Sequence, residues 1–281
     1  MIDLHTHSSF SDGSMTPEQL VAEAERQGLA AVALTDHDTV GGVERFLAAG
    51  KGSAVRAVPG VEISVDYAVG TMHVLGYFVD HHHPALLGRM KELQSGRSDR
   101  NDEILRRLNS MGLILGMNEV RAYAGEDNVG RLHFSLALVA RGYVRTREEA
   151  FEKYLAKGKQ GYVDRPHLTP EAGITMIHDA GGVAVLAHPF TLNVGKYGLI
   201  DLAGKLVGFG LDGIEVYYPQ QSAKQCKLYR AIARQFDLVS TGGTDFHGSA
   251  LPDIRLGRGF GTLNVPDSVL EKLDERRQRQ H

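Results

Sequence analysis

Short apolar runs, most of them ending beside a histidine or an acidic residue, are the feature that most constrains how this chain can fold. Such runs predict buried strands, and helical patterns fill several of the intervals between them. This alternation is typical of an α/β protein with a largely parallel sheet. The seven candidate strands span residues 2–5, 31–35, 55–63, 72–79, 183–187, 213–217 and 238–241. We expect them to form a barrel-like (β/α) fold rather than an open sheet.

Two of the predicted helices begin with a Thr-Pro pair. Thr16 can cap the first helix, Pro17 suits its first helical position, and Gln19 can complete a capping box. Thr169 and Pro170 give the same start to the second helix. Both signals place helices between candidate strands, as the alternation requires.

The segment 89–170 interrupts this alternation, because it contains helical patterns and no convincing strand. We interpret it as a helical insertion that could cover a substrate, between barrel segments 1–88 and 171–281. Its predicted helices span residues 100–111, 132–141 and 147–157.

The insertion differs in charge from the rest of the chain. The 281 residues carry 31 Lys and Arg against 34 Asp and Glu, and this net charge of −3 excludes a basic coat over the whole molecule. Segment 89–170 has 15 basic and 11 acidic residues, a net +4, which leaves −7 for the remainder. This asymmetry suits an anionic substrate held under a basic cap, although a solvated helical face would explain it equally well.

The sequence also indicates a cellular compartment. Cys226 is the sole cysteine, so no disulfide can form within the chain. The start Met-Ile-Asp-Leu-His lacks the features of a signal peptide, and no apolar stretch is long enough for a membrane span. We therefore expect a cytoplasmic protein.

Histidines and carboxylates gather where the predicted strands end. His5 and His7 close the first strand, and both imidazoles can reach one ion because residues i and i+2 of a strand point the same way. Asp245 and His247 repeat that spacing after the last strand. The carboxyl ends of parallel strands share one face of a barrel, so this set predicts a site for Zn, Mn or Fe. The other candidate ligands are Asp12, His37, Glu62, His188 and, within its strand, His73.

These motifs together resemble the PHP (polymerase and histidinol phosphatase) family. The resemblance implies a distorted (β/α)7, TIM-like barrel with a small helical insertion, and phosphoester hydrolysis with two or three divalent metal ions. The matching elements span nearly the whole chain: His5-Thr6-His7 with Asp12, Thr35-Asp36-His37-Asp38, Glu62, His73, His188-Pro189 and Gly243-Thr244-Asp245-Phe246-His247.

The same resemblance divides the ligands among three ions. The first would be held by His5, His7, Glu62 and Asp245; the second by Glu62, His73 and His188; the third by Asp12, His37 and His247. Many family members have His at the position of Asp12, and the harder carboxylate shifts the preference toward Mn, with Fe or Zn as alternatives. The implied reaction is attack on phosphorus by a hydroxide that bridges the first two ions.

Asp36 and Asp38 flank the candidate ligand His37 and are candidate catalytic residues. We expect at least one of them to orient this imidazole, as carboxylates commonly do for metal-bound histidines. For Asp38, capping of a loop is an equal alternative.

Within the insertion, Gly130-Arg131-Leu132-His133 resembles the Gly-Arg-Pro-His element of a PHP subgroup, from which Leu132 departs. That subgroup contains 3′,5′-nucleoside bisphosphate phosphatases and 5′-to-3′ exoribonucleases. Arg131 is the candidate for gripping phosphate, because guanidinium binds it bidentately. His133 could donate to a phosphate oxygen or protonate the leaving group. Lys159 and Arg100 are further candidates for binding the substrate.

We therefore expect a metal-dependent phosphoesterase that removes the 3′-phosphate of a 3′,5′-bisphosphonucleotide. The alternative is 5′-to-3′ exonuclease activity on short 5′-phosphorylated RNA. A histidinol-phosphate phosphatase and a non-catalytic PHP module are further alternatives. The expected partner is a small phosphorylated nucleotide or short RNA, and no obligate protein partner is evident.

Overall fold

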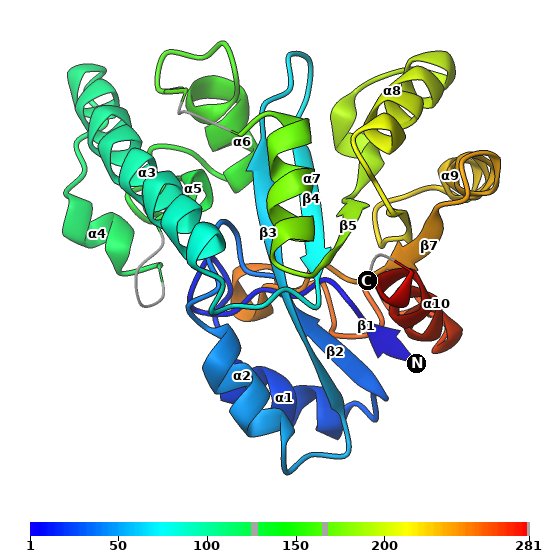
Figure 1. The fold of residues 1–281 in the computed structure, drawn as a ribbon. Helices are drawn as coiled ribbons and strands as arrows, with labels where there is room; N and C mark the ends of the chain where they lie inside the picture. Colours follow the sequence, from blue (N-terminus) through cyan, green and yellow to red (C-terminus); the bar gives the residue numbers. More distant parts are fainter. Residues whose placement is uncertain (125–128, 165–167, 280–281) are drawn as a thin grey trace.

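The computed structural model describes residues 1–124, 129–164 and 168–279. Its seven strands lie in one sheet in the order of the sequence, and each falls where an apolar run predicts it (Figure 1). The strands are β1 (Ile2–Asp3), β2 (Ala31–Leu34), β3 (Arg56–Val65), β4 (Met72–Tyr77), β5 (Val183–Leu186), β6 (Gly213–Tyr217) and β7 (Val239–Gly242).

One strand departs from the parallel arrangement that we expected. β4 runs antiparallel to both β3 and β5, whereas the other neighbouring pairs are parallel. Residues 66–71 link β3 to β4 without a helix, and so short a link permits only an antiparallel pair. Because β4 is reversed, His73 at its start pairs with Ser64 near the end of β3. The sequence placed His73 within its strand, unlike the other candidate ligands. The reversal of β4 nevertheless brings it beside them.

The sheet is curled and open, so the predicted closed barrel is met only in part. The segments that follow β1 and β7 nevertheless run together. The Leu4 amide donates to the Gly242 carbonyl at 3.3 Å, and the Asp245 amide donates to the His5 carbonyl at 2.9 Å. Thr6 and Phe246 form a parallel bridge. These contacts bring the chain after the first strand against the chain after the last.

Both Thr-Pro signals are confirmed as helix starts. Thr16 and Gln19 form a capping box on α1, and the Thr169 hydroxyl accepts from the Ala172 amide on α7. The helices outside the predicted insertion are α1 (Pro17–Arg26), α2 (Val43–Gly50), α7 (Pro170–Asp179), α8 (Lys196–Gly208), α9 (Ala223–Gln235) and α10 (Ser268–Gln278), with short 3-10 turns η2 (Pro189–Leu192) and η3 (Gly248–Ala250).

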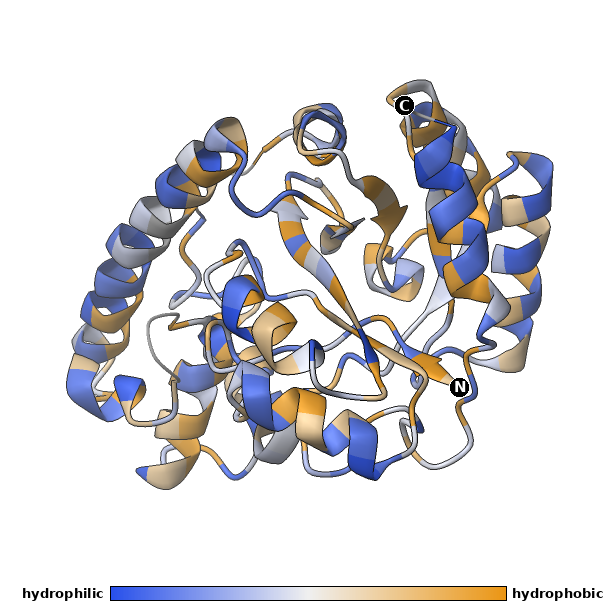
Figure 2. Cartoon of the chain, turned by 60° about the horizontal axis from the view of Figure 1, so that its bottom comes forward, coloured by the Kyte–Doolittle hydropathy of each residue, from blue (hydrophilic) through white to orange (hydrophobic). Residues whose placement is uncertain are grey.

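Apolar side chains fill both sides of the curled sheet. One core lies between the sheet and its helices, including Leu20, Phe46 and Ile177, and a second lies on the other face, including Leu4, Tyr77 and Leu273. In Figure 2, hydrophobic colour lies along several strands, and hydrophilic colour lies on the outer sides of the helices. Among the described residues, no helix is both long enough and apolar enough to cross a membrane.

The helices of segment 84–155 lie together on one side of the sheet (Figure 1). Their own core includes Ile104, Leu108 and Phe134. The predicted boundary at residue 89 falls inside α3, which is a single helix of 27 residues. The helices are α3 (Pro84–Ser110), α4 (Met117–Arg121), α5 (Arg131–Ala140) and α6 (Arg147–Ala150), followed by a π-helical turn, η1 (Phe151–Leu155).

Candidate metal centre

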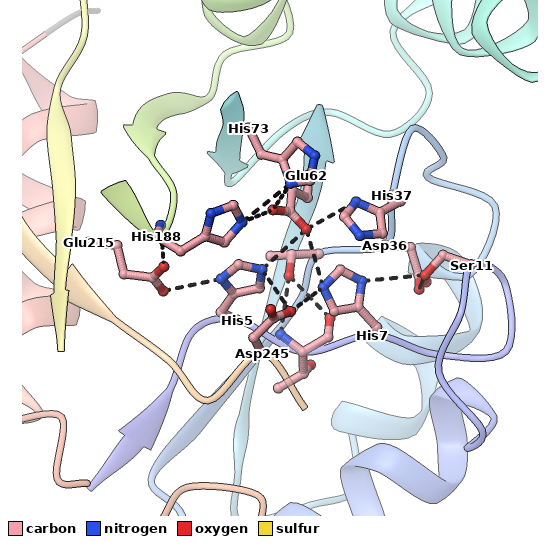
Figure 3. Close-up of polar contacts among 12 residues, drawn as sticks. His5, His7, Ser11, Asp36, His37, Glu62, His73, His188, Glu215 and Asp245 are labelled. Carbon is pink, nitrogen blue, oxygen red and sulfur yellow. Dashed lines mark hydrogen bonds and ion pairs between the residues drawn. The ribbon is translucent and has the colours of Figure 1, made fainter. Parts of the chain in front are cut away.

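The curled sheet brings all nine predicted ligands together. Figure 3 shows Glu62 of β3 among His5, His7, His37, His73, His188 and Asp245. This carboxylate is fully buried. Its Oε2 atom lies 3.2 Å from His5 Nε2, 3.2 Å from His7 Nε2 and 3.1 Å from His37 Nδ1. Three imidazoles from the segments after β1 and β2 therefore converge on one oxygen.

The other oxygen of Glu62 faces the reversed strand. Its Oε1 atom lies 2.8 Å from His73 Nδ1 and 2.9 Å from His188 Nε2. The two imidazole nitrogens are themselves 3.2 Å apart. Glu62 thus stands between two groups of histidines, one on each oxygen, as a bridging ligand would.

Two aspartates complete the cluster. Asp245 Oδ1 lies 2.9 Å from His7 Nε2 and 3.3 Å from His5 Nε2. Asp12 Oδ1 lies 3.1 Å from His247 Nε2 and 3.7 Å from His7 Nδ1. The loops after β1 and β7, which the contacts described above hold together, supply all five of these residues.

The donor atoms are close enough together to share cations. Within each of three overlapping sets, one ligand atom per residue lies within 4.8 Å of the others. His188 is outside these sets but contacts Glu62 and His73. The sets are His5, His7, Glu62 and Asp245; His37, Glu62 and His73; and His7, Asp12, His37 and His247.

The chemistry of the buried donors fits divalent metal ions. Several buried nitrogen and oxygen atoms that face one another here have no hydrogen-bond partner within the described part of the chain. Leaving such atoms without partners in a protein interior costs about 1–3 kcal/mol each. A cation would satisfy them together. The atoms are His5 Nε2, His7 Nε2, Asp12 Oδ1, Glu62 Oε2 and Asp245 Oδ1.

The electrostatics keep the carboxylates ionised. Burial raises the pKa of Glu62, but the electrostatic influence of the surrounding imidazoles of His37, His5 and His73 holds that pKa well below its ordinary value. Burial likewise raises the pKa of Asp245, and the charge of His5 contributes to lowering it well below normal. Both side chains are therefore anionic, which is the form that binds a metal.

The imidazoles divide into two kinds. Burial lowers the pKa of His7, but its close contacts with the carboxylates of Asp245 and Glu62 raise it to about 10. For His37, burial outweighs the nearby carboxylates and lowers the pKa to about 3. His37 is thus a neutral donor, whereas a cation that binds His7 would displace a proton.

Backbone strain marks the same region. His188 and Asp245, both in the cluster, and Asp38 beside it have positive φ angles of 24°, 55° and 52°. Residues other than glycine rarely adopt this conformation, and it is found preferentially at functional sites. Here it aims two ligand side chains directly after β5 and β7.

Two residues that the sequence did not lead us to expect support the ligands. Glu215 of β6 is fully buried, with Oε1 3.1 Å from His5 Nδ1 and Oε2 accepting from the His188 amide at 2.7 Å. The Tyr218 hydroxyl donates to Asp245 Oδ2 at 2.8 Å. Glu215 could have been noticed as the acidic residue inside the otherwise apolar run 213–217.

Asp36 and Asp38 brace the loops of the centre. Asp36 accepts from the Ser8 amide at 2.7 Å and from the Ser11 hydroxyl at 2.5 Å, and Ser11 lies 3.4 Å from His7 Nδ1. Asp36 therefore reaches His7 through Ser11. The expectation that at least one of Asp36 and Asp38 orients His37 stays a prediction. Asp38 accepts from the Ser64 amide at 2.9 Å, which is the loop-capping alternative. Their catalytic roles stay a prediction.

A cleft of about 390 Å³ adjoins the centre, since His73 is part of its wall. Arg131, Arg100 and Lys157 line it together with the carboxylates of Asp66 and Asp164, and substrate binding by the two arginines stays a prediction. The Arg131 guanidinium lies 5.1 Å from the centre of the Tyr162 ring. We call this hollow the cap cleft.

Two predicted substrate residues have other positions. Lys159 is exposed and is not part of the wall of the cap cleft. His133 is only 1% exposed, and its Nδ1 atom accepts from the Gly130 amide at 2.9 Å, which caps the start of α5. His133 thus positions the helix turn that carries Arg131, and its role as a proton donor stays a prediction.

Comparisons with known proteins identify the family of the chain. Residues 3–165 match the model of the PHP domain family. The 5′-3′ exoribonuclease Rnm of Escherichia coli is 36% identical over 258 residues, which cover 91% of this chain and 88% of that protein. The 3′,5′-nucleoside bisphosphate phosphatase of Chromobacterium violaceum is 33% identical over 247 residues, covering 88% and 87%.

A solved structure has a similar fold. An amidohydrolase from Chromobacterium violaceum, with bound sulfate and no metal, has a TM-score of 0.89 at 31% identity, covering 98% of this chain and 96% of that one. The matching family, the relatives and the clustered donors point to one chemistry. The chain belongs to the PHP domain family and is a metal-dependent hydrolase of phosphoester bonds.

Proposed function

We propose that this protein removes the 3′-phosphate of a 3′,5′-bisphosphonucleotide. The observation that carries the proposal is that His73 belongs both to the donor cluster and to the wall of the cap cleft. A nucleotide with a phosphate at each end would place one at the cluster and the other among Arg131, Arg100 and Lys157. The arginines suit this role because guanidinium binds phosphate bidentately.

Two or three divalent ions, with Mn favoured, would be held by the nine cluster residues in the division given by the family resemblance. The distances support the first set, His5, His7, Glu62 and Asp245. The distances also place His7 near Asp12 and His247. His7 therefore lies beside the residues proposed for the first ion and those proposed for the third. When bound, the ions would lower the pKa of a water molecule and neutralise charge on the phosphoryl oxygens.

The protein's own groups prepare this chemistry. Glu215 fixes the ring of His5 through Nδ1, which directs Nε2 toward Glu62. Tyr218 holds one oxygen of Asp245, which leaves Oδ1 facing the histidines. His133 holds the first turn of α5, so that Arg131 is presented to the cap cleft. The first two contacts limit the rotation of candidate ligand side chains before substrate binds, and the third fixes the backbone turn that precedes Arg131.

A second candidate is 5′-to-3′ exonuclease activity on short 5′-phosphorylated RNA. It is favoured by the 36% identity to an enzyme of that name. The bond broken is again a phosphoester on the 3′ oxygen of a nucleotide with a 5′-phosphate. The two substrates differ in whether a chain continues beyond the phosphate at the centre.

The test is phosphate release by the Mn-loaded protein from adenosine 3′,5′-bisphosphate, with histidinol phosphate run beside it. We expect release from the bisphosphate, and we expect Arg131→Gln to raise its KM by roughly 10- to 100-fold, as loss of a charged hydrogen bond implies. Arg121→Gln is the matched control, because Arg121 is exposed on α4 and outside the cap cleft. A preference for histidinol phosphate would refute the proposal, and inert metal-loaded protein would favour a non-catalytic module.

A further inference from the structure

A second groove, of about 820 Å³, adjoins the metal centre on another side. Tyr218 forms part of its wall and donates its hydroxyl proton to Asp245 Oδ2 at 2.8 Å. Helix α9 forms much of the rest, and Figure 1 shows α9 across the sheet from α3–α6. We call this hollow the α9 groove. The metal centre therefore has the cap cleft beside His73 and the α9 groove beside Tyr218.

One face of α9 makes the groove cationic. Lys227, Arg230 and Arg234 are exposed, line the groove and follow the i, i+3, i+7 spacing of a single helix face. None of the three forms an ion pair with a described residue, and no Asp or Glu is among the groove's described lining residues. In a chain with a net charge of −3, such a surface is suited to an anion.

Gln221 gives the groove a buried polar group that lacks a partner. This residue is 9% exposed, and neither its Nε2 nor its Oε1 atom has a hydrogen-bond partner in the described part of the structure. A buried amide without partners is costly, so a ligand that supplies both a donor and an acceptor would stabilise it. The edge of a nucleobase offers that pair, and exposed bases of single strands are bound in this way.

Phe260 adds an exposed aromatic surface to the same wall. Its side chain is 55% exposed. The loop that carries Phe260 packs closely against Pro219, because a Cβ atom on the neighbouring Gly259 would lie 2.7 Å from Pro219 Cγ. Gly259 and Gly261 take positive φ angles of 54° and 117°, which glycine adopts without strain. An aromatic ring held outward beside cations is the arrangement on which single-stranded bases stack.

We propose that the α9 groove binds the nucleotides on the 3′ side of the scissile phosphodiester in a short single-stranded RNA. The inference rests on the proposed hydrolysis, with the 5′-terminal nucleotide in the cap cleft and its 3′-phosphate at the metal centre. A bisphosphonucleotide ends at that phosphate and has nothing to place in the groove. An RNA chain continues, and its next phosphates and bases would meet Arg230, Gln221 and Phe260.

Binding is measured first, in EDTA so that the RNA stays intact, by fluorescence anisotropy of a 5′-phosphorylated tetraribonucleotide labelled at its 3′ end. The variant is Arg230→Gln with Arg234→Gln. We expect affinity to fall about tenfold at low salt, and the slope of log affinity against log salt to flatten by about 0.7 for each phosphate that the variant no longer binds. The matched control is Lys224→Gln, which removes an exposed charge from α9 outside the groove.

Two further variants test the uncharged part of the groove. Gln221→Met keeps the side-chain volume, and Phe260→Ala removes the exposed ring. Each should weaken RNA binding by roughly 5- to 50-fold, because stacking and base contacts have this magnitude, without changing the salt slope. In the Mn-loaded protein, the ratio of KM for the tetraribonucleotide to KM for adenosine 3′,5′-bisphosphate should rise by the same factor.

The outcomes separate this inference from the proposed function. If every groove variant binds the RNA as tightly as the Lys224→Gln control does, the inference is overturned, even if both substrates are hydrolysed. An equal rise in KM for both substrates would also overturn it, because the groove would then serve the bisphosphate too. Groove-dependent RNA binding by a protein that hydrolyses the RNA but releases no phosphate from the bisphosphate would support the inference and refute the proposed function.

Discussion

At the residue scale, the centre consists of buried ionisable groups. Each would be costly to bury alone, and their contacts with one another reduce that cost. Glu62, His5 and His7 are fully buried, and each would be costly as an isolated charge. Their mutual contacts reduce this cost, yet Glu62 Oε2 and both Nε2 atoms still lack hydrogen-bond partners within the described residues. The remaining imbalance is the physical reason to expect cations.

Glu215→Gln tests how the ligands are oriented. The amide would keep the shape of Glu215 but remove the charge beside His5 Nδ1, and it could place a donor against the imidazole N–H. We expect Mn affinity to fall by about 10- to 100-fold, as for other residues that orient metal-bound histidines. Isothermal titration of metal-free protein with Mn measures this.

Glu25→Gln is the matched control for that substitution, since Glu25 is exposed on α1. Its Mn affinity should equal that of the wild type. Wild-type affinity in Glu215→Gln as well would show that the charge of Glu215 has no part in holding the ligands.

At the scale of elements, the centre depends on how closely the segments after β1 and β7 approach. Gly243 follows β7 directly, and a Cβ atom there would lie 2.3 Å from the His5 amide nitrogen. The atom it would strike is backbone, which cannot move without displacing the ligands. Glycine is therefore required at 243 because the two segments approach closely, and not because the backbone turns there.

Gly243→Ala should lower the free energy of unfolding by about 1–3 kcal/mol, the usual cost of overpacking. It should also weaken Mn binding, because His5 would shift. Urea unfolding of metal-free protein gives the first quantity. Gly52→Ala is the control, because a Cβ atom at Gly52 meets nothing within 4 Å; equal stability of the two variants would contradict the close approach.

Helices α1 and α2 offer a pH test. Arg45 donates to Glu18 at 2.7 Å, and this hydrogen bond lowers the pKa of Glu18 from 4.5 to about 2. The carboxylate is the form stabilised by folding, so the contribution is present above pH 4.5 and is lost as the pH falls toward 2. Arg45→Gln should cost less than about 1 kcal/mol at pH 7, as exposed pairs do.

Urea unfolding of wild type and Arg45→Gln at several pH values checks this prediction. The difference in free energy should be constant above about pH 5 and should shrink below about pH 4.5. A difference that grows on acidification would contradict the assigned sign.

The elements also show what a sequence of this kind can and cannot predict. Apolar runs and Thr-Pro caps located the strands and two helix starts, because burial and capping are local. The antiparallel direction of β4 was not predicted from the overall alternation, and it follows from the short link formed by residues 66–71. Glu215 was missed because it lies within an apolar run. Of the two lysines at 157 and 159, it is Lys157 that lines the cap cleft, which the sequence did not distinguish.

At the scale of the whole molecule, two hollows whose walls carry cations adjoin the metal centre. The cap cleft carries Arg100, Arg131 and Lys157, and the α9 groove carries cations on its helix. The first reaches the centre at His73 and the second at Tyr218, which contacts Asp245. This arrangement suits a substrate that extends on both sides of the phosphate to be hydrolysed.

Because the centre joins both ends of the chain, metal binding should stabilise the entire fold. Mn at about 100 times its Kd would add about 2.7 kcal/mol, or roughly 5–10 °C in Tm for a protein of this size. Calorimetry of wild type with EDTA and with Mn measures the shift. Glu62→Gln should reduce the shift strongly and Glu25→Gln should leave it intact; a full shift in Glu62→Gln would place the metal elsewhere.

The most direct test of the central claim is the rate of phosphate release from adenosine 3′,5′-bisphosphate as a function of Mn bound per chain. Metal-free protein would be titrated with Mn, and the bound metal and the initial rate would be measured in the same samples. We predict no hydrolysis without metal and a plateau at two or three ions per chain. Full activity after the metal has been removed would contradict this claim.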